Sequence, residues 1–497
     1  MTAAPLPTTP LPPPVGAPTE SVPRVHPRRL PTPTRLELAQ RSAHIARVAA
    51  RHLGPVAVRQ ARELRAGALP PVALARPLRL TCEALGGTFM KFGQMVASSP
   101  GLFGEEFSDE FRSCLDTGPP VPFSAVRERV EDDLGLRLDE AFREFEREPV
   151  GRASIAVVHR ARLLDGRQVA VKVLRPGIEK LVAADLDLMQ PFFDLLARET
   201  GDQMAGSTLQ LLDGLRQQLG EELDLRNEAR ALAHFRLLTA EIDLPLVVVP
   251  EPYPQLSGQN VLTMEYLKGI PVDDLAKVAE LGYDPAPLVE QVVRGFFITT
   301  VRWGAFHGDV HAGNMLLLDD GRIGIIDWGI VGRLDHDTHQ FFLRLLDGAL
   351  GDESAWPDIT AHLTKTYGRA IQVGLGLDDD QLTAFIRSLI EPTLTRPFGE
   401  VSLAALLEAP QVQAARAEGV QAHGRTLRSV VRRVRTQRRM RRMADEAGGL
   451  MSDFDRGTFL LGKQLMYFER YGKLFLADVP ILADREFFAT LLAGAPR

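Results

Sequence analysis

The sequence predicts an α+β protein in which a helical N-terminal region precedes a small sheet-rich lobe and a large, mostly helical lobe. Three observations predict this order. Helical apolar spacing begins at Arg35, short alternating apolar runs flank an Asp-Gly turn between about residues 138 and 175, and helical spacing then dominates the rest of the chain. A chain of 497 residues is too long for one ordinary domain, so we expect about two to four compact units.

The composition is that of an ordinary globular protein. Hydrophobic residues make up 45% and charged residues 25%, and the net charge of -6 argues against a nucleic-acid-binding protein defined by overall charge. Cys82 and Cys114 are the only cysteines, so no disulfide framework is implied and a zinc site built from several cysteines is excluded. No uninterrupted apolar run reaches about 18 residues, and the N-terminus lacks a secretory pattern. We therefore expect a cytoplasmic protein without a transmembrane helix.

Each segment has its own pattern. Residues 1–34 are rich in Pro and Thr and predict a disordered tail, because they cannot bury enough apolar surface. Residues 35–135 predict a helical extension. Residues 136–267 form the sheet-rich lobe, in which "LDGR" joins two strands as a hairpin, followed by helical spacing and further strands. Residues 268–497 predict the large lobe and additional C-terminal helices.

The stretch "FHGDVHAGNMLLLDDGRIGIIDWG" contains an ordered set of oxygen ligands, Asp309, Asn314 and Asp327. Magnesium prefers oxygen ligands and keeps several waters, so two such side chains can hold it. The turn "DDGR" would fold the flanking strands together and bring Asn314 close to Asp327. In the alternative, these residues only cap turns, but the ordered set favours a magnesium and phosphate site.

A lysine inside an apolar strand is costly unless its ammonium meets an anion. Lys172 in "VAVKVL" is such a residue, and Glu228 in "LDLRNEAR" lies on a later helix from which it could supply the counter-charge. The alternative is a surface lysine whose stem covers apolar neighbours.

These residues together resemble protein-kinase-like folds, and specifically the UbiB/AarF family of atypical kinases, which is ubiquinone-biosynthesis kinase-like. In the kinase pattern, the Lys of V-A-I-K pairs with a helix Glu, and a catalytic loop and D-F-G segment follow. The resemblance implies a two-lobed fold that binds ATP or ADP with Mg²⁺. It also implies that Asp309 acts catalytically with Lys172 and Glu228, and that Asn314 and Asp327 hold the metal.

Two further matches point to this family rather than to ordinary kinases. "KFGQ" supplies Lys91 and Gln94 of a K-x-G-Q signature, and "ELD" supplies Glu222 and Asp224 of an E-x-D signature. By resemblance, the K-x-G-Q helix lies across the mouth of the active site and restricts the substrates that enter.

Two segments would surround the nucleotide. "LTMEYLKG" resembles a kinase hinge, with Met264 as gatekeeper and the backbone of Glu265 to Leu267 against adenine, although an ordinary buried strand is an equal alternative. "GRASIAVVHRA" resembles the family's Ala-rich phosphate loop, but two alanines are replaced there. The residues of this loop that we expect near phosphate are Gly151, Arg152, Ala153 and Ser154. Arg152 either contacts phosphate or points into solvent.

The sequence therefore predicts an ATP- and Mg²⁺-dependent atypical kinase or ATPase that acts on, or is regulated by, a small molecule. The resemblance implies isoprenoid or quinone-lipid metabolism. The alternative from another class is a nucleotide-binding pseudokinase that serves as a scaffold or presents a lipid. A protein Ser/Thr kinase is less favoured, because the extension would restrict peptide docking and no A-P-E segment follows "DWG".

The C-terminal region adds two helices of interest. Residues 423–443 carry many Arg and no acid, a pattern that fits peripheral contact with anionic lipid, although an Arg-rich solvated helix packed on acidic neighbours is favoured over it. Nucleic acid is not an expected partner. The stretch "GKQLMYFERYGKLFLADVPIL" predicts a packed core helix rather than a membrane anchor, because charged residues interrupt it.

Overall fold

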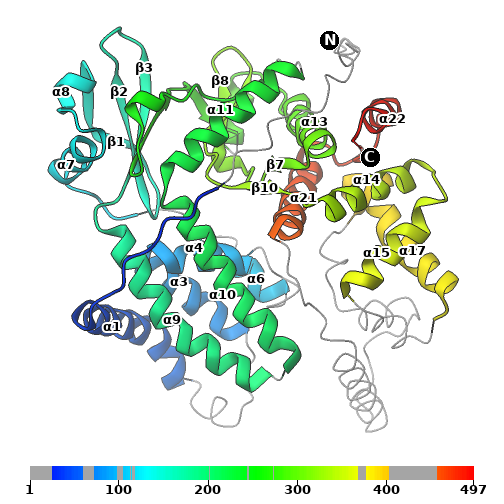
Figure 1. Ribbon diagram of the computed structural model, residues 1–497, viewed down its shortest axis with the longest axis horizontal. Helices are drawn as coiled ribbons and strands as arrows, with labels where there is room; N and C mark the ends of the chain where they lie inside the picture. Colours follow the sequence, from blue (N-terminus) through cyan, green and yellow to red (C-terminus); the bar gives the residue numbers. More distant parts are fainter. Residues whose placement is uncertain are drawn as a thin grey trace.

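The computed structural model has the expected α+β, two-lobed architecture with a helical extension (Figure 1). The structure describes residues 25–59, 72–97, 105–111, 114, 118–200, 202–242, 246–272, 274–367, 377–401 and 456–496. The predicted basic helix at 423–443 lies outside the described residues, so its proposed membrane contact stays a prediction. Within the described ranges, none of the helices is both long and apolar enough to cross a bilayer.

The helical extension is larger than the sequence suggested. It contains α1 (Arg35–Arg59), α3 (Val72–Leu85), α4 (Gly87–Ala97) and α6 (Glu105–Phe111). Two long helices that follow the third strand, α9 (Ile178–Thr200) and α10 (Asp202–Glu222), pack beside these helices (Figure 1). A buried ion pair of 2.6 Å joins Arg41 of α1 to Asp185 of α9. Residues from inside the predicted sheet-rich lobe thus complete the extension.

The small lobe is built on an antiparallel sheet in the order β1-β2-β3-β5. Its elements are α7 (Phe123–Leu134), α8 (Leu138–Ala141), β1 (Glu144–Arg152), β2 (Ala156–Arg162), β3 (Gln168–Leu174), α11 (Leu225–Glu241), η1 (Pro254–Leu256) and β5 (Val261–Glu265). The "LDGR" hairpin joins β2 to β3, with Gly166 at a φ of 93°, as its turn chemistry predicts. Successive side chains of β3 face opposite sides, so Val171 and Val173 join the core beneath α7 while Ala170 and Lys172 face the other way.

Two small sheets shape the junction between the lobes. One has the order β4-β9-β8-β6 and the other pairs β10 with β7. Their elements are β4 (Val247–Val248), β6 (Gly269–Pro271), β7 (Ala305–His307), η2 (Ala312–Asn314), β8 (Met315–Leu318), β9 (Ile323–Ile325) and β10 (Val331–Arg333). The predicted "DDGR" hairpin is present, and Met315 lies opposite Ile325. This pairing places Asn314 and Asp327 at the same end of the hairpin.

The large lobe consists mainly of helices around the junction (Figure 1). They are α12 (Leu275–Glu280), α13 (Ala286–Trp303), α14 (His336–Leu350), α15 (Ala355–Tyr367), α17 (Asp379–Thr395), η3 (Phe398–Glu400), α21 (Arg456–Phe475) and α22 (Arg485–Ala493). The predicted core character of α21 is confirmed. Its Phe468 ring lies 4.9 Å from Phe296 of α13 and is almost fully buried.

The predicted Pro-rich tail covers residues 1–34, and the part of the chain that the structure describes begins within it, at residue 25. Residues 1–24 lie outside the described residues, but 25–34 have a defined path along the small lobe and α10 (Figure 1). The backbone N–H of Arg28 donates to Gly220 O at 2.6 Å. Polar contacts of this kind order a segment without apolar periodicity, which is why the composition did not reveal it.

Candidate active site

A buried lysine on the central strand of the small lobe is the first element of the site. The Lys172 ammonium lies 2.9 and 2.8 Å from the two carboxylate oxygens of Glu228 on α11, and 3.4 Å from Oδ2 of Asp327. Burial acts to lower the pKa of Lys172, but Asp327 and Glu228 raise it above its ordinary value. Lys172 is therefore fully charged, and it links the small lobe to the "DWG" segment.

A buried histidine joins the catalytic loop to the same segment. The Nε2 atom of His307 donates to the backbone oxygen of Asp327, and its Nδ1 accepts from the Asp309 N–H at 3.0 Å. Burial lowers the pKa of His307 to about 4, so the ring is neutral at physiological pH. The two hydrogen bonds fix its tautomer and hold the backbone of Asp309 relative to that of Asp327.

The side chain of Asp309 meets a cation from the far end of the chain. The ammonium of Lys463 on α21 lies 2.7 Å from Oδ1 of Asp309. Burial acts to raise the pKa of Asp309, but Lys463 and His311 are among the positive charges that together hold the pKa below its ordinary value. Lys91, on α4 of the extension, acts in the same direction. The carboxylate is thus ionised, and it has positive charge near it from α21 and from the helical extension.

Asn314 and Asp327 provide a ligand set that suits magnesium. The amide Nδ2 of Asn314 donates to the backbone oxygen of Asp309 at 3.0 Å, which leaves its Oδ1 able to act as a ligand. Asp327 accepts from the Gly329 N–H through Oδ1, and its side chain is 46% exposed. Desolvation in the site acts to raise the pKa of Asp327, but Lys172, the Gly329 N–H and Lys91 together hold the pKa well below its ordinary value.

The part of the chain that the structure describes has no cluster of three His, Cys, Asp or Glu side chains that could hold a metal ion. One carboxylate and one amide, supplemented by waters and phosphate oxygens, are sufficient for Mg²⁺ but not for a metal held only by protein. The residues present therefore fit a magnesium ion that arrives with a nucleotide.

The tryptophan of "DWG" keeps this segment in place. The Trp328 ring packs 4.6 Å from Phe235 of α11 and 4.5 Å from His307. Its backbone N–H donates to Glu228 Oε1 at 3.3 Å, and its indole N–H donates to Ile325 O at 2.8 Å. The same glutamate therefore receives both Lys172 and the backbone of Trp328.

The predicted hinge forms the edge of the small sheet. Met264 is buried and lies opposite Ala170 of β3. The Glu265 N–H donates to Glu251 O at 2.7 Å, so this donor is already used by the protein. A Cβ at Gly324 would lie 2.7 Å from the Leu267 side chain, which places Leu267 directly over β9.

The predicted phosphate loop is a tight connection between β1 and β2. The Ala153 N–H donates to Ala156 O at 2.9 Å, and Gly151 pairs with Val158 in the sheet. Ser154 is buried within the turn. Arg152 lies 3.7 Å from Glu148 on the same strand, and both side chains are exposed, at 44% and 91%. Arg152 thus points into solvent in this structure, and its contact with phosphate stays a prediction.

The signature residues of the extension divide into two groups. Lys91 of α4 forms an ion pair of 2.9 Å with Glu222 at the end of α10, and both side chains are largely buried. Gln94 lies one turn after Lys91 on the same helix. Asp224 does not join them. Its carboxylate instead caps the N-terminus of α11 and receives the Arg226 guanidinium at 2.6 Å.

Comparisons with known proteins agree with this geometry. The ABC1 atypical kinase-like domain matches residues 113–355. An uncharacterized aarF domain-containing protein kinase of Arabidopsis thaliana, named as chloroplastic, is 32% identical over 435 residues, which cover 85% of this chain and 75% of that protein. The chain belongs to the UbiB/aarF family of atypical kinases.

The chain is also similar to a bacterial kinase and to a solved structure. A probable protein kinase UbiB of Cellvibrio japonicus is 31% identical to this UbiB/aarF-family chain over 352 residues, which cover 68% of this chain and 60% of that protein. The solved complex structure of Rv3197 with erythromycin from Mycobacterium tuberculosis has a TM-score of 0.44 and 23% identity, and the match covers 74% of this chain and 85% of that one.

The sequence analysis missed three residues of the site. His307 could have been found from the H-x-D spacing before Asp309. Lys463 and its neighbour Gln464 lie on α21, outside the residues that match the ABC1 domain. The only local signal was a lysine within an apolar helix, which also describes many surface residues.

Proposed function

We propose that this protein is a magnesium-dependent phosphotransferase or ATPase that uses ATP or ADP and acts on, or is regulated by, a small molecule. The observation that carries the proposal is the shared contact of Lys172 with both Glu228 and Asp327. This contact brings the phosphate-binding lysine of a kinase together with the expected metal ligand.

Each residue has a role that its contacts support. Lys172, held by Glu228, would bind nucleotide phosphate oxygens. Asn314 and Asp327 would hold magnesium, which when bound would neutralise the charge of the phosphates. Asp309, ionised beside Lys463, would orient or accept the proton of a hydroxyl or a water. His307 would keep this carboxylate in position through the backbone.

The restriction to small acceptors rests on the extension. The charge of Lys91 lowers the pKa of both Asp309 and Asp327, so its ammonium acts on both acids of the site. The ion pair with Glu222 anchors this lysine there. A helix in this place leaves less room for a peptide, and an isoprenoid or quinone-like lipid is the substrate class that the family resemblance suggests.

A nucleotide-binding scaffold is the second candidate. It is favoured by the engagement of Asp309 with Lys463, since an aspartate held in an ion pair is less available to an acceptor. Both candidates would bind nucleotide, but only the enzyme would release phosphate from it. Phosphate release therefore separates them.

Nucleotide binding is tested by thermal unfolding. We expect ATP or ADP to raise the melting temperature only with magnesium, and Asp327→Asn to abolish the increase. Phosphate release is then measured with and without quinone-like or anionic lipids, and Asp309→Asn should remove it. A wild-type chain whose melting temperature is unaffected by nucleotide would overturn the proposal.

A further inference from the structure

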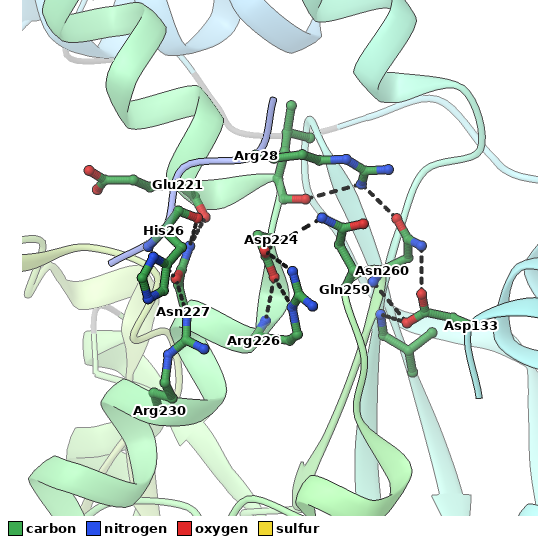
Figure 2. A network of polar contacts seen from close by, with 12 residues as sticks. His26, Arg28, Asp133, Glu221, Asp224, Arg226, Asn227, Arg230, Gln259 and Asn260 are labelled. Atoms are coloured by element: carbon green, nitrogen blue, oxygen red, sulfur yellow. Dashed lines mark hydrogen bonds and ion pairs between the residues drawn. The ribbon is translucent and has the colours of Figure 1, made fainter. Parts of the chain in front are cut away.

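A short N-terminal segment crosses the corner between two helices that serve the site. Residues 26–30, here called the strap, pass over the α10–α11 corner at residues 219–228 (Figure 2). His26 and Asn227 exchange two hydrogen bonds, of 3.0 and 3.1 Å, between backbone and side-chain amide. Together with the bond from Arg28 N–H to Gly220 O, these contacts attach the strap to both helices.

The guanidinium of Arg28 ties the corner to the sheet. It donates to Leu223 O at 3.2 Å and to Asn260 Oδ1 at 2.7 Å, just before β5 (Figure 2). Asn260 in turn donates to Asp133 of α7 at 2.6 Å. A third contact, of 3.6 Å, reaches Glu179 of α9. One side chain therefore joins the corner to the small sheet and to the helical extension.

This corner carries one acidic partner for each of two site lysines, Lys91 and Lys172. Glu222 ends α10 and pairs with Lys91, whereas Glu228 lies in the first turn of α11 and pairs with Lys172. Site side chains must be held to within about 0.5 Å, and supporting contacts provide that precision. Movement of the corner would shift both carboxylates at once.

A glycine in the last turn of α10 permits the strap to pass. A Cβ at Gly220 would lie 3.2 Å from Pro27 Cβ and 3.5 Å from Arg28 O. Glycine in a helix costs about 1 kcal/mol relative to alanine. At Gly214 of the same helix, a Cβ would have nothing within 4 Å. The two glycines thus differ in whether a side chain would displace the strap.

We infer that the strap is a positioning element, in which Arg28 holds the α10–α11 corner so that Glu228 stays on Lys172 and Glu222 on Lys91. Release of the strap would lower the turnover of the site. This effect on turnover rests on the proposed function, but the effect on Lys172 does not. Conditions that detach the N-terminal segment would therefore regulate the site from a distance.

The test measures how fast an amine-reactive reagent labels Lys172 in the full chain, quantified by mass spectrometry. Arg28→Ala should loosen Glu228 and accelerate labelling of Lys172 severalfold, because the ammonium would be less enclosed by its carboxylate partner. Arg28→Lys should retain part of the protection. Arg29→Ala is the matched control, because Arg29 is an adjacent but exposed arginine, and it should label like the wild type.

A second pair of variants leaves the charge unchanged. Gly220→Met should displace the strap and accelerate labelling, while Gly214→Met on the same helix should not. If Lys172 in Arg28→Ala were labelled at the wild-type rate, even with a lower melting temperature, the inference would be overturned. Faster labelling in Arg28→Ala but not in Gly220→Met would also overturn it. If the wild-type chain released no phosphate, the proposed enzymatic function would be wrong, but the labelling rates would still test the role of the strap.

Discussion

The charged residues of the site lie far apart in the sequence, and the pairing of acids with lysines keeps the acids ionised. Asp309 is the acid that our proposal requires to be ionised, and the Lys463 ammonium lies 2.7 Å from it. A buried carboxylate without such a partner would be destabilised in its charged form. We therefore assign Lys463 a part in keeping Asp309 both charged and oriented.

Replacing this lysine should impair turnover more than binding. In Lys463→Met we expect phosphate release to fall about a hundredfold to a thousandfold, the range for loss of one preorganised donor. Lys463→Arg should retain most of the rate. Lys473→Met is the control, because Lys473 lies on the same helix, pairs with Glu469 and is 40% exposed. Equal losses in the two methionine variants would remove Lys463 from the site.

His307 should make folding stability depend on pH. Its folded pKa of about 4 lies below the value of about 6.5 in the unfolded chain, so the unfolded state binds more protons. Its contribution is complete above pH 6.5 and is lost as the pH falls toward 4. Lowering the pH from 7 to 5 should therefore reduce the free energy of unfolding by about 2 kcal/mol through protonation of this residue in the unfolded chain.

Urea denaturation at the two pH values measures this loss. His307→Gln cannot titrate in this range, so its stability should fall by about 2 kcal/mol less than that of the wild type. The comparison is between pH dependences, so a lower stability of the variant at pH 7 does not affect it. Identical pH dependences would assign the titration to other groups.

At the scale of elements, the sequence predicted those structures that depend only on residues close together in the chain. Both Asp-Gly turns gave hairpins, since each turn needs only its own residues, such as Gly321 with a φ of 82°. The order of Lys172, Glu228, Asp309 and Asp327 predicted a shared site. Nothing local placed Lys463 on Asp309 or Arg28 on Asn260, because those contacts depend on how distant helices and segments pack.

Helix α21 supports the catalytic loop through one fully buried side chain. Gln464 accepts from the Val310 N–H at 2.9 Å and donates to Val310 O at 3.3 Å. Gln464→Leu would leave both backbone groups buried without partners, which should lower the unfolding free energy by about 2 kcal/mol. Amide exchange at residues 308–314 should also accelerate.

The control for this variant is Gln340→Leu on α14. Gln340 lies at a partly exposed position, and its amide donates a surface hydrogen bond to Pro496 O at 3.1 Å. Its substitution should change stability and loop exchange little. If Gln464→Leu behaved in the same way, α21 would not be a support of the catalytic loop.

At the scale of the whole molecule, both ends of the chain complete a kinase-like centre. Lys91 comes from the N-terminal extension and Lys463 from α21, and both lie outside residues 113–355, which match the ABC1 domain. Helices outside the matched residues also complete the hydrophobic core of the large lobe. Phe468 of α21 contacts Phe296 at 4.9 Å, and Phe488 of α22 contacts Phe297 at 5.1 Å. The matched residues therefore lack part of their own core.

A chain ending at Val401 should consequently fail to form a native large lobe. Removal of α21 and α22 would expose Phe296 and Phe297 on α13, and loss of a large buried aromatic costs about 3 to 5 kcal/mol. Two such losses approach the total stability of an ordinary domain, about 5 to 15 kcal/mol. We expect the shortened chain to lose its near-ultraviolet circular dichroism and to bind a hydrophobic dye. A monomeric shortened chain that unfolds cooperatively at the wild-type temperature would show instead that the large lobe folds without these helices.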